Sequence, residues 1–414
     1  MHAGLRAAPA CIVAALALAL GGCGEPATGD PPKPKDGAGK LTIYSSLPLH
    51  GPDRERSRDM VGAIELALQE DRRKIANLRI GYVALDSSTA EDGTWTRDRV
   101  LKNARRAIAD ESTIAYIGDL HSAATALALP LVNEGNILQV TPGSTYDGLT
   151  RPGGSRKGEP ERFYPSGKRT FGRVLAPDHA EASALVGYMK EQGVKRLAIL
   201  TDRGLYGGGM GEQIERAAGA QGLELEGRDR IDARQGDLSG PARGVVSSGA
   251  DAFFFAGETD AGAVRIFDAV AAAGPGMRLF APAAAAAGAF VRDLSPAAAR
   301  RMRITTPTLP PRLLPRSARA FERRFRRAFH RRPAPDALLA YEAAKVVLRS
   351  IRNAGRRGND RTVVVDEFFA MRDRRSVLGR YSIDGHGDTS LSTYAASRVR
   401  GSRLVLDELL KVRG

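Results

Sequence analysis

The sequence predicts an α/β fold made of two lobes, each a parallel sheet with helices on both of its faces. Apolar runs of strand length alternate with segments of helical period from residue 41 onwards, which favours parallel sheets. The alternation stops between Gly148 and Lys168, where Gly, Pro, Arg and Ser dominate, and then starts again. The chain is also too long for one simple core. We therefore expect two Rossmann-like lobes with a ligand cleft between them.

The first lobe is predicted to begin with a strand at 40–47 and a helix whose apolar residues recur at helical spacing between Met60 and Leu68. A second strand is expected at 79–85. A second helix is expected around residues 100–108.

The segment 113–145 is typical of a βαβ unit. An apolar run at 113–117 precedes a helix that begins at Ser122, and a second apolar run at 137–140 ends in the turn 141–145. In a parallel sheet both turns lie at the carboxyl edge, where α/β sheets bind ligands, and Ser122 would add free helix N–H groups there. A small carboxylate could bind between them. Ordinary capping and turn formation explain the same residues.

The second lobe is predicted over residues 173–308. Asp178 and Glu181 have the spacing of a capping box, ahead of a helix that ends near Gly193. A strand follows at 195–201, and its exit leads through Tyr206 and three glycines into another helix. Further strands are expected at 223–226, 251–256, 278–281 and 303–306, with a helix at 260–273.

Beyond Pro307 the pattern predicts helices near 316–330, 335–354 and 362–372, then short strands at 379–383 and 393–398. These helices have to pack on one of the two lobes or on both. We therefore expect residues 41–172 plus about 309–378 to form lobe 1, and residues 173–308 plus about 379–414 to form lobe 2. The chain would then cross between the lobes several times, which is the form of a hinge.

The N-terminus is typical of an export signal. Residues 1–22 combine Arg6 with a short apolar region, and Gly21-Gly22 precede Cys23. This ending resembles a bacterial lipobox, which implies that Cys23 is lipidated and that the protein is exported and anchored to the outer face of the cell membrane, or periplasmic. A chance Cys after a hydrophobic start is the alternative. Residues 23–40 are rich in Gly, Pro, Asp and Lys, and we expect a flexible tether there.

The formal charge of +15 could attract an anionic membrane or nucleic acid. The most basic segment, 316–332, contains eight Arg, but Phe321, Phe325 and Phe329 recur every four residues. That spacing favours an amphipathic helix with its Phe residues in the core, and nucleic acid is not expected as a partner.

No catalytic or metal-binding pattern is present. The six His residues do not pair at a familiar metal-ligand spacing. Asp384 and Asp388 flank His386, but acids in such a Gly-rich segment are better explained as turn formers. No nucleophile elbow, complete P-loop or dinucleotide fingerprint occurs. We therefore expect no enzyme activity, no metal and no cofactor.

Five segments in this order resemble periplasmic binding protein type I, and specifically the branched-chain amino-acid binding proteins of ABC importers. They are 47–52, 116–122, 141–145, 202–209 and 379–387. The resemblance covers about residues 40–400. It implies a ligand carboxylate on Ser122, a backbone carbonyl from Gly143, a hydroxyl from Thr145, and Tyr206 closing from the second lobe. The same turn would place the hydroxyl of Ser144 at the carboxyl edge of the sheet.

Three places depart from the family pattern. One is the first-lobe loop, where the charged residues 54–56 stand in place of small or aromatic ones. The family often has an aromatic residue where Glu258 stands, and often binds the α-ammonium through a Glu near Ala283, where this chain has no acid. Glu258 or Asp260 could bind the ammonium from a shifted position, because a buried cation needs a carboxylate partner. A solvated turn explains Glu258 equally well.

The resemblance implies an extracytoplasmic solute-binding protein that closes on an amino acid or similar small carboxylate and delivers it to an ABC permease in the membrane. The alternatives are a ligand sensor of the same fold that acts on a membrane receptor, and an extracytoplasmic hydrolase.

Overall fold

The computed structural model describes residues 39–152, 156–233, 236–257, 261–286, 288–310 and 312–412. The expected signal peptide, Cys23 and most of the expected tether lie outside these residues, and so does Glu258. Within the described part of the chain, every helix is too short or too polar to span a lipid bilayer.

The first sheet has the strand order β2-β3-β1-β4-β5-β6, and all neighbours run parallel except β2 against β3. The strand order therefore reverses between β1 and β4, and open α/β sheets bind ligands beside such a reversal. The strands are β1 (Lys40–Leu47), β2 (Lys74–Ile75), β3 (Leu78–Asp86), β4 (Thr113–Gly118), β5 (Leu138–Thr141) and β6 (Phe171–Arg173).

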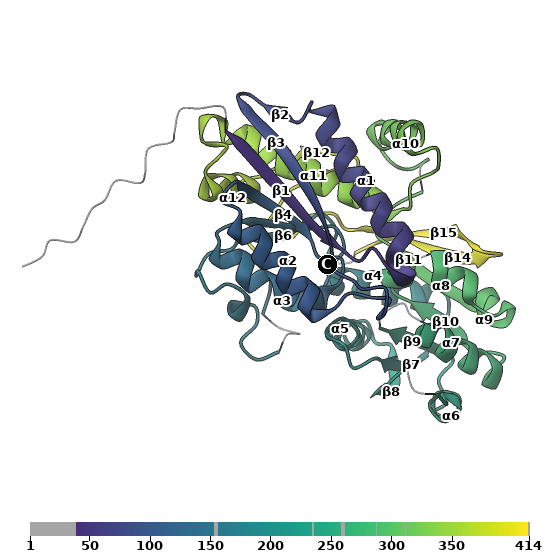
Figure 1. Ribbon diagram of the computed structural model, residues 1–414. Helices are drawn as coiled ribbons and strands as arrows, with labels where there is room; N and C mark the ends of the chain where they lie inside the picture. The colour runs from purple at the N-terminus through teal and green to yellow at the C-terminus, as the bar shows by residue number, and fades with distance from the viewer. Residues whose placement is uncertain are drawn as a thin grey trace, which may run out of the picture. The chain divides into compact units, whose positions relative to one another are not determined.

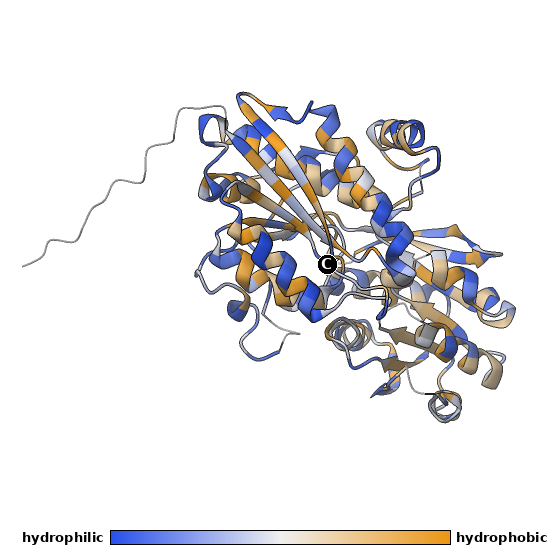
Figure 2. Ribbon diagram, viewed as in Figure 1, coloured by the Kyte–Doolittle hydropathy of each residue, from blue (hydrophilic) through white to orange (hydrophobic). Residues whose placement is uncertain are grey.

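Helices cover both faces of this sheet (Figure 1). Apolar residues of β1, β3, β4 and β5 meet α1, α11 and α12 on one face, and Tyr44 and Tyr116 meet α2 and α3 on the other. Figure 2 shows α2 alternating between hydrophilic and hydrophobic residues, as expected of a helix with one face in a core. The helices are α1 (Arg54–Glu70), α2 (Arg97–Ala109), α3 (Ser122–Glu134), α10 (Arg316–Phe329), α11 (Asp336–Asn353) and α12 (Arg361–Phe369).

The basic helix α10 packs on the first lobe through its phenylalanines. Phe321 and Phe325 are 2% and 0% exposed and belong to the same core as α1 and α11, while Phe329 is partly buried against it. Its arginines are exposed. The amphipathic interpretation of this segment is therefore confirmed.

The second sheet has the strand order β15-β14-β11-β10-β9-β7-β8. Strands β7 to β11 run parallel, and their order reverses between β7 and β9 in the same way as in the first sheet. Strands β14 and β15 are antiparallel additions at one edge. The strands are β7 (Arg196–Thr201), β8 (Glu224–Arg230), β9 (Ala252–Ala256), β10 (Arg278–Ala281), β11 (Met302–Thr306), β14 (Thr393–Arg400) and β15 (Arg403–Lys411).

Two groups of helices sandwich this second sheet. Helices α4 and α5 pack on the face that includes Phe254 and Phe280, and α6 to α9 pack on the face that includes Phe253 and Phe255. These consecutive phenylalanines can all be buried because β9 is covered on both sides. The helices are α4 (Asp178–Glu191), α5 (Leu205–Gln221), α6 (Ser239–Ser247), α7 (Ala261–Ala273), α8 (Gly288–Asp293) and α9 (Pro296–Arg301).

Three parts of the described chain connect the two sheets. Residues 174–177 lead from β6 to α4, residues 307–315 lead from β11 to α10, and residues 382–392 lead from β13 to β14. Strand β13 (Arg380–Tyr381) pairs only with β12 (Arg374–Arg375) in a separate small sheet. The short 3-10 helices are η1 (Gly51–Asp53), η2 (Asp147–Leu149), η3 (Glu161–Phe163), η4 (Ala283–Ala286) and η5 (Gly355–Arg357).

The expected α/β fold is confirmed, with differences at the sheet edges. The sequence predicted purely parallel sheets and missed β15, whose alternation of charged and apolar residues is weak because it lies at an edge. Tyr381 and Ile383 lie in the core of the first lobe, whereas β14 and β15 belong to the second sheet. The expected assignment of all of 379–414 to lobe 2 stays a prediction.

Candidate ligand-binding site

A cavity of about 70 Å³ lies at the carboxyl ends of the strands of both sheets. Because one water molecule needs roughly 10–15 Å³ of such space, the cavity suits a small solute. Its walls come from both lobes and from two of the connecting segments. The lining residues are Arg56, Leu120, His121, Ser122, Pro142, Gly143, Thr145, Leu175, Glu181, Tyr206, Gly257, Ala283, Ala284, Pro307, Asp336 and Leu339.

The two points of strand reversal explain where this cavity forms. Arg56 stands at the start of the helix after β1, and Ser122 begins the helix after β4. In the second lobe, Tyr206 follows β7 and Gly257 follows β9. Both reversal points therefore open onto one cavity, as doubly wound sheets lead us to expect.

Ser122 is placed to donate a hydrogen bond into the cavity. Its Oγ accepts the backbone N–H groups of Thr145 and Tyr146, both at 3.3 Å. A serine hydroxyl has two lone pairs and one proton, so the proton is left for another acceptor. The first-turn amides of α3 lie beside it, and a helix N-terminus favours a negative charge. Ser122 can therefore bind an anionic oxygen.

The turn after β5 contributes two of its three predicted residues. Gly143 and Thr145 line the cavity. A side chain on Gly143 would come within 2.5 Å of Leu120 Cδ1, so glycine is needed for the turn to pack there. Ser144 does not line the cavity. Its hydroxyl lies 2.6 Å from Thr125 Oγ1 and 3.0 Å from the Asp119 carbonyl oxygen that accepts its proton.

Tyr206 lines the cavity from the N-terminal turn of α5. Burial raises the pKa of its hydroxyl well above the usual value, and the carboxyl groups of Glu181 and Asp178 raise it further. The phenol therefore stays protonated at neutral pH and can donate a hydrogen bond.

Glu181 lines the cavity, and the capping-box prediction for it is wrong. Helix α4 begins after Pro177 with no side-chain cap. The Oε1 atom of Glu181 instead accepts the backbone N–H of Ala283 at 2.6 Å and the hydroxyl of Thr305. Sequence reasoning missed this residue because an acid three positions into a helix is usually explained by local capping.

Although no acid follows β10 near Ala283, the carboxylate of Glu181 lies beside this residue. Ala283 and Ala284 line the cavity from η4, where the family pattern would have a Glu, and the carboxylate beside them comes from α4. Burial raises the pKa of Glu181 to about 7, and the hydrogen bonds from Thr305 and Ala283 limit that rise.

A charged cluster forms the first-lobe end of the cavity. Asp53 accepts hydrogen bonds from Arg56 Nε at 2.7 Å, and it lies 2.7 Å from His121 Nε2. Arg56 also lies 3.5 Å from Asp336. Burial opposes ionisation of Asp53, but Arg56 and His121 outweigh it and hold the pKa of this carboxyl well below its usual range. The sequence marked Arg56 only as an unusual residue in this loop.

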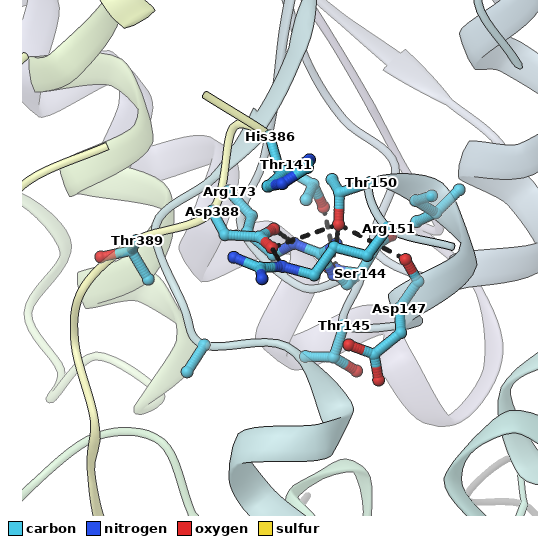
Figure 3. A network of polar contacts seen from close by, with 12 residues as sticks. Thr141, Ser144, Thr145, Asp147, Thr150, Arg151, Arg173, His386, Asp388 and Thr389 are labelled. Atoms are coloured by element: carbon cyan, nitrogen blue, oxygen red, sulfur yellow. Dashed lines mark hydrogen bonds and ion pairs between the residues drawn. The ribbon is translucent and has the colours of Figure 1, made fainter. Parts of the chain in front are cut away.

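A buried ion pair fixes the turn that carries the site (Figure 3). Arg173 is 0% exposed, and its Nε donates to Asp388 Oδ1 at 2.8 Å. Its Nη1 donates to the carbonyl oxygens of Ser144 and Tyr146, both at 3.2 Å. Burial opposes ionisation of Asp388, but Arg173 and then Arg151 keep the pKa of its carboxyl low.

This arrangement also accounts for the acids around His386. Asp388 is bound by Arg173 and Arg151, and Asp384 by Arg151. Among the described residues, no group of three or more potential ligands could bind a metal ion.

The sequence profile of the periplasmic binding protein family matches residues 42–402. The chain belongs to this family. The members of this family are binding proteins and not enzymes. The two sheets of the chain form the type I fold of the family. Among proteins with curated sequences, none matches it significantly.

Several solved structures share the fold of this periplasmic binding protein. A leucine-binding protein from Thermotoga maritima has 21% identity and a TM-score of 0.76, over 90% of this chain and 99% of that one. A branched-chain amino-acid binding protein from Streptococcus pneumoniae, solved with isoleucine, has 17% identity and a TM-score of 0.75, over 90% and 99%. A solute-binding protein from Rhodopseudomonas palustris, solved with benzoate, has 17% identity and a TM-score of 0.71, over 89% and 96%.

We predict that Arg173→Met lowers the free energy of unfolding by about 3–5 kcal/mol, because it leaves Asp388 buried without its main partner. Urea denaturation measures the change. Arg151→Met removes another partner of the same carboxylate. Because the Arg151 side chain is 35% exposed, this substitution should lower the free energy of unfolding clearly less. Equal losses in the two variants would contradict the central role of Arg173.

Proposed function

We propose that this protein is an extracytoplasmic solute-binding protein of an ABC importer and that it binds an amino acid or a similar small carboxylate between its lobes. The observation that carries the proposal is the hydroxyl of Ser122, whose two lone pairs are occupied and whose proton is available at the N-terminus of a helix that borders the cavity. A carboxylate is the small anion that such a site suits best.

The solutes of the similar structures support this class of ligand. Leucine, isoleucine and benzoate differ in their apolar parts and share a carboxylate. In this chain the walls between the polar ends are apolar, with Leu120, Leu175 and Leu339 among the lining residues. We infer that these side chains contact the apolar part of the solute.

Binding would proceed by closure of the lobes around the solute, and the closed protein would then dock on a membrane permease. Three connecting segments allow a hinge motion while they keep the lobes in register. In this structure Gly209 of α5 packs against the ring of Tyr146, and we infer that this contact belongs to the closed protein. A Cβ atom on Gly209 would lie 2.5 Å from two ring carbons.

The N-terminal sequence supports an anchor at the outer face of the cell membrane. If Cys23 is lipidated, Cys23→Ala should move the protein from the membrane fraction to the soluble fraction after cell breakage. Immunoblotting of the two fractions measures this. A variant that still sediments with membranes would rule out the lipid anchor and leave the binding function untouched.

We predict that Ser122→Ala weakens carboxylate binding by roughly 1–3 kcal/mol, through the loss of one hydrogen bond to a charged group. The ligand would first be identified by a thermal-shift screen of amino acids, amides and small carboxylates, since a solute at about 100 times its Kd stabilises by roughly 2.7 kcal/mol. Isothermal titration would then compare the variants.

Ser144→Ala is the matched control, because it also loses buried hydrogen bonds but does not line the cavity. It should destabilise the fold and leave the Kd nearly unchanged. An unchanged Kd in Ser122→Ala would remove Ser122 from the site. A screen without any hit would count against the proposed function.

We also predict that Gly209→Ala weakens ligand binding, by roughly 1–3 kcal/mol, because the added methyl group overpacks the contact with Tyr146 in the closed protein. Gly208→Ala lies on the same helix, where a Cβ atom meets nothing within 4 Å, so it gives the same gain in helix propensity without the clash. Titration of both variants with the same ligand separates the two effects. Equal affinities would show that this contact does not matter for closure.

A further inference from the structure

We propose that Glu181 binds the ammonium group of the solute, so that the solute is an α-amino acid and not a simple carboxylate. The inference rests on the proposed function and narrows its ligand class. Helix α4 would then supply the carboxylate for the ammonium group that the family pattern places near Ala283 and that this chain lacks there.

The geometry of Glu181 leaves one carboxylate oxygen for a ligand. Both of its hydrogen bonds, from Ala283 N–H and the Thr305 hydroxyl, go to Oε1. Among the described residues, none forms a hydrogen bond to Oε2. The side chain is 1% exposed and lines the cavity, so Oε2 has little water to bind when a solute fills the space.

Most buried carboxylates in the described part of the chain have a cationic partner. Asp388 is paired with Arg173, Glu342 with Arg374 at 2.5 Å, and Asp53 with Arg56. Within the described part of the chain, Glu181 forms no ion pair. A buried charge without a partner is costly, so a cation supplied by the ligand would stabilise this site strongly.

Two other buried acids lack an ion pair among the described residues, and neither borders the cavity. Asp119 follows β4, and Asp178 begins α4 one turn before Glu181. The lining of the cavity includes Glu181 and neither of these two. Glu181 is therefore the buried acid that a solute can reach.

The two polar ends of the cavity have opposite preferences. Ser122 and the N-terminus of α3 favour an anion, and Glu181 favours a cation. An α-amino acid is a zwitterion that carries both groups. Benzoate or a fatty acid would satisfy the first end and leave Glu181 without a partner.

The proposal has a consequence for pH. An ammonium favours the ionised carboxylate, whereas burial holds the pKa of Glu181 near 7 in the empty site. Below about pH 7, binding must therefore release a proton, and affinity should fall by up to about tenfold for each pH unit. Above pH 7 the affinity should be constant.

The other titratable groups near Glu181 are retained in a Glu181 variant, so they cannot account for a pH dependence that the variant loses. Asp178 on the same helix has its pKa raised well above the usual value by burial and by Asp147. Tyr206 of α5 and Tyr394 of β14 also have raised pKa values, mainly through burial. Ala283 and Thr305, which bond to Glu181, carry no charge. Asp119 does have a pKa raised to about 7 by burial, but it is retained in a Glu181 variant.

The test is isothermal titration of the full chain with matched pairs of solutes at about pH 6 and pH 8. Suitable pairs are L-leucine with 4-methylpentanoate and L-phenylalanine with 3-phenylpropanoate, with benzoate added. We expect the wild type to prefer the amino acid by about 30-fold or more, as loss of one partner of a buried charged pair implies. In Glu181→Gln, which keeps an acceptor for Ala283 and Thr305, the preference and the pH dependence should both disappear.

Two controls make the outcome specific. Glu191→Gln changes an exposed acid at the end of the same helix and should alter neither quantity. Glu258→Gln tests the other acid that the sequence singled out, and it should keep the preference for the amino acid.

Three results would overturn the inference: a wild type that binds the deaminated acids as well as the amino acids, a Glu181→Gln variant that keeps the preference, or a Glu258→Gln variant that loses it. In each case the carboxylate-binding function stands. If none of the solutes binds, the proposed function fails and this inference fails with it.

Discussion

The buried ion pair between Arg173 and Asp388 is the constraint on which the site depends. Arg173 ends β6, just before the chain passes to the second lobe, and Asp388 lies on the last connection between the lobes. Other donors of Arg173 bind the carbonyl oxygens of Ser144 and Tyr146 and the hydroxyl of Thr150. Backbone N–H groups of the same turn donate to Ser122 Oγ. A buried guanidinium needs all of these acceptors. One side chain thereby links two connecting segments to the turn that orients Ser122.

The cavity has Ser122, held by this turn, on one side. On the other side it has Glu181, which has no cationic partner in the described part of the chain. Buried charges in proteins usually have a partner of opposite charge, as Asp53 and Glu342 do here. A site that leaves Glu181 without such a partner is less stable when empty, and it gains more when a cation arrives. A bound cation would remove this cost, so solutes with a cationic group would be favoured over solutes without one.

Local patterns predicted most of the fold and part of the site. The Phe321 and Phe325 spacing predicted their burial because a helix repeats every 3.6 residues whatever surrounds it. Ser122 and the turn 141–145 were predicted because the ends of parallel strands meet at one edge, whereas Tyr206 was predicted from the family resemblance. Ser122, Gly143, Thr145 and Tyr206 all line the cavity. Glu181 was misread as a helix cap, because its partners Ala283 and Thr305 lie more than a hundred residues away in the sequence. Ser144 was included because its hydroxyl shares the turn, although it bonds to Thr125 and does not line the cavity.

The sequence by itself determined the alternation of strands and helices, the two-lobed fold and the sheet edge at which the cavity lies. These follow from periodicity and turn chemistry, which act over a few residues. The tertiary structure decided which side chains share the cavity and which charges are paired, such as Arg173 with Asp388 and Glu181 with none among the described residues. Burial and electrostatic pairing depend on residues brought together from distant parts of the chain, and no local pattern encodes that proximity.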